Sequence, residues 1–135
     1  MLYPTDTSEV SELSDALCGK SVFGLLTDLA NSMKALVVKT ENETPLVKNC
    51  IYDLGEQASL TLTLPKEAQI GDYIQVDFIS PEEATALSVT GEDGTPVIGD
   101  IPTPEANKLY SLYCEWGRVN ASEYGWRVSY KEYPV

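Results

Sequence analysis

Hydrophobic residues in the second half of the chain recur at every second position, which is the spacing of half-buried strands. The segment at 59–64 places Leu60, Leu62 and Leu64 on one face and threonines on the other. The segment at 73–79 repeats this alternation, and a proline follows each of the two segments closely. Further strands are predicted at 47–54, 87–90, 96–98, 109–116 and 126–130.

About seven short strands separated by glycine and proline turns predict a mainly β fold, either an antiparallel β-sandwich or a small jelly roll. The dipeptide Asp93-Gly94 adds a local signal. Both central positions of a type I′ turn need a positive φ angle, and this dipeptide tolerates it. We therefore expect a hairpin between the strands at 87–90 and 96–98.

The first part of the chain has a different period. Residues 8–38 show the spacing of amphipathic helix, and this helical segment is predicted to precede the β fold. From residue 21 the apolar positions step by four, three, four and three residues, as in a coiled-coil seam. These positions are Val22, Leu26, Leu29, Met33 and Leu36.

Two interpretations of this seam remain open. So short a helix is marginal alone in water, so it must pack either on its own domain or against copies of itself. In the second case we expect a homo-oligomer, with a trimer as the best guess because the apolar stripe is wide.

A polar segment, Thr-Glu-Asn-Glu-Thr-Pro at 40–45, separates the two patterns. Its composition is typical of a linker. The sequence therefore predicts an N-terminal arm with amphipathic helices at 1–44, serving attachment or oligomerisation, and a β-sandwich module at 45–135.

The net charge of −12, from 9 basic and 21 acidic residues, argues against nucleic acid or an anionic membrane as partner. The N-terminus lacks the basic start and apolar stretch of a signal peptide, and no segment has the roughly 18 apolar residues of a membrane span. We expect a protein made and folded in a cytoplasm, not secreted by a signal peptide.

Candidate chemistry is sparse. The chain has no histidine, which removes the commonest general base and the usual triads. Asp77 and Glu115 are candidate carboxylates for sugar hydrolysis, but solvated strand faces explain them more simply. Cys18, Cys50 and Cys114 form no CxxC pair and are predicted to be buried apolar groups. We expect no enzyme activity, no cofactor and no metal.

Aromatic residues gather near the C-terminus. The period-two positions Tyr110, Trp116, Trp126 and Tyr130 are predicted to lie in the core. Tyr113, Tyr124 and Tyr133 fall off that pattern and are the candidates for an exposed contact surface, for example with a host-surface glycan.

Four segments carry a family resemblance: Ala-Ser-Leu-Thr-Leu-Thr-Leu-Pro at 58–65, Ile-Gly-Asp-Tyr-Ile-Gln-Val-Asp-Phe at 70–78, Tyr-Ser-Leu-Tyr-Cys-Glu-Trp at 110–116 and Gly-Trp-Arg-Val-Ser-Tyr at 125–130. Over about 57–135 the chain resembles small β modules of bacteriophage and prophage virion proteins, including head-fibre and capsid-decoration proteins. In such proteins an N-terminal segment fastens the molecule to the particle and the β module projects outward. The resemblance assigns no functional residues.

The resemblance implies a non-enzymatic phage structural protein located in the virion, with itself and capsid or other virion proteins as partners. Two alternatives stay open: a carbohydrate-binding or host-surface adhesion module, and a tail or baseplate component.

Overall fold

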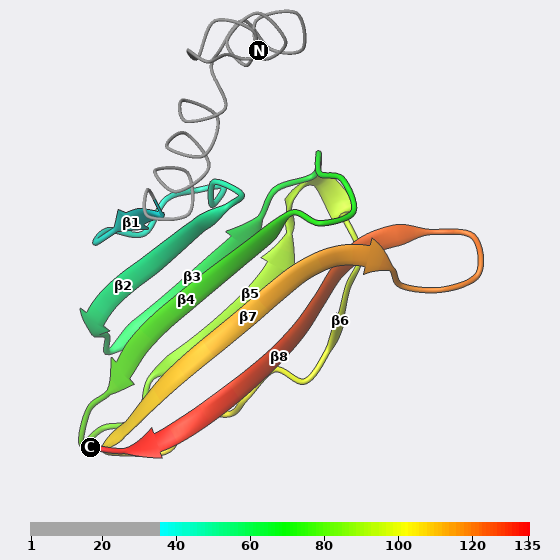
Figure 1. The fold of residues 1–135 in the computed structure, drawn as a ribbon. Helices are drawn as coiled ribbons and strands as arrows, with labels where there is room; N and C mark the ends of the chain where they lie inside the picture. Colours follow the sequence, from blue (N-terminus) through cyan, green and yellow to red (C-terminus); the bar gives the residue numbers. More distant parts are fainter. Residues whose placement is uncertain (1–35) are drawn as a thin grey trace, which may run out of the picture. The chain divides into compact units, whose positions relative to one another are not determined.

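The structure, a computed structural model, describes residues 36–135, so the predicted helices before residue 36 lie outside the described residues. Val37–Val135 form a compact unit, here called the β unit. Its strands are β1 (Val37–Lys39), β2 (Cys50–Glu56), β3 (Ser59–Leu64), β4 (Tyr73–Ser80), β5 (Ala86–Gly91), β6 (Val97–Gly99), β7 (Lys108–Arg118) and β8 (Tyr124–Pro134), as Figure 1 shows.

The strands form a six-stranded sheet in the order β1-β2-β4-β7-β8-β6 and a two-stranded sheet of β3 and β5. The predicted mainly β fold is confirmed. Antiparallel pairing joins β4 to β7 and β7 to β8, whereas β1–β2, β2–β4, β3–β5 and β6–β8 are parallel. The sheets are therefore mixed, and the prediction of purely antiparallel pairing is wrong. Because β2, β3, β4 and β5 alternate between the two sheets, the paired strands are next but one along the chain and run in the same direction.

The predicted hairpin at Asp93-Gly94 is also wrong. Both residues have the expected positive φ angle, 50° and 79°. However, they belong to a short 3-10 turn (Glu92–Gly94), after which Thr95 donates its backbone N–H and its hydroxyl to the carbonyl of Glu92. This turn leads from β5 in the small sheet to β6 in the large sheet, so the two flanking strands do not pair with each other.

Residues 37–45 pack differently from the predicted helix end and linker. Val37 and Val38, expected in the helix, begin β1, which suits β-branched side chains. In the expected linker the Asn42 side-chain amide donates to the carbonyl of Thr61 at 2.9 Å. The division at residue 44 stays a prediction, but residues 37–44 belong to the β unit.

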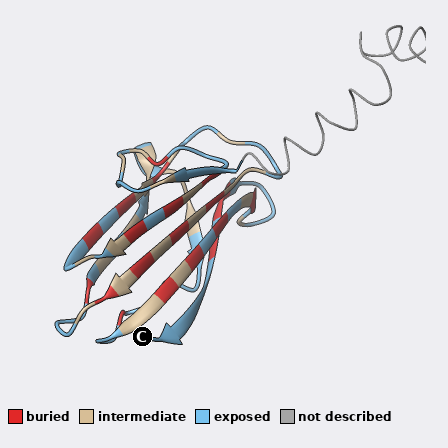
Figure 2. Cartoon of the chain, turned by 60° about the vertical axis from the view of Figure 1, so that its left-hand side comes forward, coloured by how far each residue is buried: buried red, intermediate tan, exposed pale blue. Residues whose placement is uncertain are grey.

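Both sheets contribute to one hydrophobic core. Burial alternates along the strands in Figure 2 as the period-two pattern predicted. Trp126 is fully buried, and its indole N–H donates to the carbonyl of Pro65 at 2.8 Å. Cys50 and Cys114 are buried free thiols, as predicted, while Cys18 lies outside the described residues. The other large core side chains are Leu46, Tyr52, Leu54, Leu60, Leu62, Leu64, Ile74, Val76, Phe78, Tyr110, Leu112 and Val128.

Residues 36–135 contain no helix with the length and apolar character needed to cross a membrane.

Candidate binding surface

The large sheet has a second face, here called the outer face, which points away from the core. Side chains alternate along a strand, so each central strand that buries one row of residues presents another. These residues are half-buried or exposed: Tyr73, Gln75, Asp77 and Ile79 of β4, Leu109, Ser111, Tyr113 and Glu115 of β7, and Arg127, Ser129, Lys131 and Tyr133 of β8.

Strand register arranges the outer face in rows that run across β4, β7 and β8. The central row joins Asp77, Ser111 and Lys131. The neighbouring rows are Gln75, Tyr113 and Ser129 on one side and Ile79, Leu109 and Tyr133 on the other, and a fourth row joins Tyr73, Glu115 and Arg127. Residues from three distant segments of the sequence thus become immediate neighbours.

Both carboxylates that the sequence singled out lie on this face and are already bound. Asp77 accepts hydrogen bonds from the Ser111 hydroxyl at 2.7 Å and from the Gln75 side-chain amide at 3.2 Å. Glu115 forms an ion pair with Arg127 at 3.0 Å. Their register separates them by four positions, roughly 13 Å along the strand, more than the roughly 5–9.5 Å between paired glycosidase carboxylates. The arrangement therefore does not favour a catalytic pair.

The three candidate surface tyrosines do not form one cluster. Tyr113 is 42% exposed and Tyr133 is 45% exposed, and both lie on the outer face. Tyr113 also stacks on Tyr73, with ring centroids 6.2 Å apart. Tyr124 is exposed as well, but it lies at the β7–β8 turn with the Arg118 guanidinium 4.8 Å from its ring centre.

A groove of about 380 Å³ lies beside Tyr113 and Tyr133 on β7 and β8, lined also by Ser111, Ser129, Tyr130 and Lys131. The sequence pattern gave no reason to single out the two serines and the lysine. Their only signal is the period-two spacing with the tyrosines, which became informative once the register placed β7 beside β8.

Tyr130 was predicted to be a core residue, and that is wrong: it is 38% exposed. Tyr130 lies beyond the pairing of β8 with β6, which runs only from Trp126 to Val128. The amide of Asp100 donates to the carbonyl of Val128, and no β6 residue is paired with β8 beyond that point. The C-terminal part of β8 therefore has β7 on one side and an open edge on the other (Figure 1).

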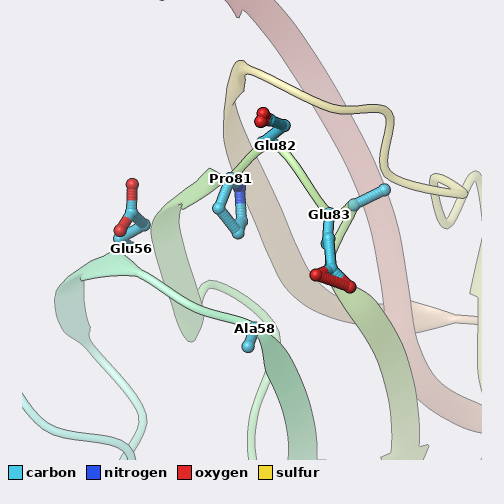
Figure 3. Close-up of a pocket in the computed structure, with 6 residues that line it drawn as sticks. Glu56, Ala58, Pro81, Glu82 and Glu83 are labelled. Carbon is cyan, nitrogen blue, oxygen red and sulfur yellow. The ribbon is translucent and has the colours of Figure 1, made fainter.

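A second hollow, of about 640 Å³, lies where β2, β3 and the loop after β4 meet. Glu56, Glu82 and Glu83 line it together with Ala58, Pro81 and Ala84. Figure 3 shows that the three carboxylates point in different directions instead of toward a common centre. In agreement, residues 36–135 hold no group of three side chains suited to a metal ion.

The clearest changes in pKa lie away from the outer face. Burial, followed by a hydrogen bond to Glu43, raises the pKa of Tyr52, whose hydroxyl donates to that carboxylate at 2.6 Å. The same bond lowers the pKa of Glu43, with help from Lys39. Burial alone raises the pKa of Cys114 to about 12. The Tyr52 hydroxyl also accepts from the backbone N–H of Val47, so these bonds join β2 to residues 43–47.

Of the predicted seam, Leu36 is exposed, whereas Val22, Leu26, Leu29 and Met33 lie outside the described residues. Comparisons of the chain with protein-family models, with curated proteins and with solved structures find no match.

Proposed function

We propose that this chain is a non-enzymatic structural protein of a bacteriophage particle, a capsid-decoration or head-fibre component that displays its β unit. The observation that carries the proposal is the outer face, a broad sheet surface with exposed tyrosines. The two carboxylates on this face, those of Asp77 and Glu115, are held by neighbouring side chains. A sheet face left open in this way suits display and contact. The resemblance of residues 57–135 to virion modules supports the phage assignment, and a tail or baseplate location is its nearest variant.

The proposal includes two finer points of architecture. First, the two sheets form a β-sandwich, since buried side chains from both belong to one hydrophobic core. Second, the N-terminal segment attaches the protein to the particle and joins copies through the predicted seam, with a trimer as the expected state.

Protein identification on purified particles tests the structural role. We expect the chain in intact virions at a copy number comparable to that of other capsid or fibre components. Its absence, or presence only in trace amounts, would rule out a structural role.

The oligomer is tested by measuring mass in solution by light scattering. We expect the full chain to be a trimer and a chain beginning at Val37 to be a monomer. The shortened chain starts there because β1 and Glu43 belong to the β unit. Leu29→Asp places a charge in the seam and is expected to dissociate the full chain. A monomeric full chain would contradict assembly through the seam.

A second candidate function, carbohydrate binding, is favoured by the groove beside Tyr113 and Tyr133. Partly exposed aromatic rings next to hydroxyl groups suit the apolar face and the hydroxyls of a sugar. This function is compatible with display on a particle, because an exposed module is placed to meet a host surface. Binding of the full chain to a glycan array tests it, and an array without any binding would end this proposal.

A further inference from the structure

We infer that the groove beside Tyr113 and Tyr133 binds a carboxylated sugar, with Lys131 holding the carboxylate. The inference rests on the proposed carbohydrate-binding function and narrows it to acidic glycans.

Lys131 differs from every other basic side chain among the described residues. It has neither an ion-pair partner nor an aromatic partner within that part of the chain. All the others have one: Lys39, Lys48, Lys66, Lys108, Arg118 and Arg127. In a chain of net charge −12, acidic groups are abundant, so a cation left unpaired beside a groove is free to receive an anion from outside.

The negative net charge does not prevent this contact. At physiological ionic strength charges are screened over about 8 Å, so distant carboxylates matter little at the groove. The nearest acid in the same row, Asp77, is two strands away from Lys131, about 9.5 Å, and it already accepts bonds from Ser111 and Gln75. A bound carboxylate in contact with the ammonium gains a charge-assisted hydrogen bond.

The rest of the groove suits a sugar ring. Tyr113 lies opposite Ser129, while Tyr133 lies opposite Leu109, so the two tyrosines are about 13 Å apart along the strands. Stacking on Tyr73 fixes the orientation of the Tyr113 ring. Between the tyrosines lie hydroxyl groups, and because Ser111 gives its proton to Asp77, its oxygen is available to accept one from the ligand.

A second copy of the chain fits this place poorly. If two open β8 edges paired around a two-fold axis centred on Lys131, Tyr130 would lie opposite Glu132 of the other copy. That register sets Lys131 against Lys131 of the other copy, a like-charge pair at the shortest cross-strand spacing. Pro134 adds a position without an N–H donor near the end of the edge.

The test uses the full chain on an array that carries matched neutral, carboxylated and sulfated glycans. We expect the carboxylated glycans to be retained. Lys131→Gln is then expected to weaken binding of the best carboxylated glycan about tenfold or more, and Tyr113→Ala and Tyr133→Ala to weaken it as well. The matched controls are Lys66→Gln and Tyr124→Ala, an exposed lysine and an exposed tyrosine outside the groove, and both should leave binding unchanged.

Thermal unfolding of each variant checks that the fold is intact. Retention of neutral glycans alone, or unchanged affinity of Lys131→Gln for carboxylated ones, would overturn the acidic-sugar assignment and leave carbohydrate binding in place. If no glycan on the array is bound, or if a peptide strand binds along the β8 edge instead, both carbohydrate binding and the acidic-sugar assignment would be overturned.

Discussion

The two halves of β8 carry the same alternation of side chains but differ in how deeply those side chains are buried. Trp126, in the first half, is fully buried between the sheets, whereas Tyr130, four residues later on the same side of the strand, is 38% exposed. The first half has β6 on one side and β7 on the other, and the second half has only β7. The alternation therefore tells which side chains share a face, while the layer packed on that face decides which of them are covered: Trp126 reaches the carbonyl of Pro65, directly after β3 in the small sheet. Figure 2 shows the exposed end of the strand near the C-terminus.

The largest expected difference between the halves is in stability. Trp126→Ala should lower the free energy of unfolding by about 3–5 kcal/mol, because it empties a buried site and removes the bond to Pro65. Tyr130→Ala should cost about 1 kcal/mol or less, mainly its contact with the Tyr110 ring. Denaturant titration measures both. Equal losses would mean that the covered and open halves are packed alike.

The cover provided by β6 depends on a close approach at Gly99. A side chain there would collide with the backbone of Val128, and its φ angle of +109° also disfavours any residue but glycine. Gly99→Ala should therefore destabilise the protein. Gly71→Ala is the matched control, because its φ angle is +101° but the space around it is open. We expect Gly99→Ala to cost about 1–3 kcal/mol more than this control in denaturant titrations. Similar costs would show that β6 does not need the close contact.

Cys114 of β7 lies opposite Val128, in the half of β8 that β6 also flanks, so its ionisation tests the burial of that half. Burial raises its pKa from about 9 to about 12, so the unfolded thiol ionises before the folded one. This contribution to stability is present below pH 9 and lost as the pH rises toward 12, by up to about 1.4 kcal/mol per pH unit. Cys114→Ala should therefore lose less stability than the parent chain above pH 9, as measured by unfolding at each pH.

Thiol labelling of the folded protein sharpens the same comparison. Cys114 should resist a thiol reagent, whereas a cysteine introduced by Ser129→Cys in the open half should react readily. Rapid labelling of Cys114 without unfolding would contradict the buried environment described here.

The smallest effect concerns self-association through the open edge. A lysine on an edge strand discourages pairing with other chains. Lys131→Val should therefore make the mass in solution rise with concentration beyond that of the parent chain. Arg127→Val, in the half already covered by β6, is the control and should not do so. An unchanged mass for Lys131→Val would show that other features protect the edge.

Local patterns of the chain predicted much of the β unit. The strand at 59–64 appears with the predicted bounds, and Leu60, Leu62 and Leu64 are all buried, because the period of two is a property of the strand backbone. Tyr113 and Tyr133, on the other face of their strands, are exposed for the same reason. Tyr124 is exposed as expected, but it shares the side of Trp126 and lies at the β7–β8 turn. Asp93 and Gly94 adopt the positive φ angles that their types tolerate, although the turn serves another connection.

What the sequence by itself determined is therefore local: strand positions, the faces of most side chains, and an acidic chain without histidine. Only the tertiary structure decided that β2 to β5 alternate between two sheets, which makes their pairing parallel. It alone brought Ser111 and Lys131 together beside two tyrosines and left half of β8 uncovered. The physical reason is that strand pairing joins residues far apart in the chain, and backbone hydrogen bonds hold any register alike, so the choice belongs to the packing of the whole unit.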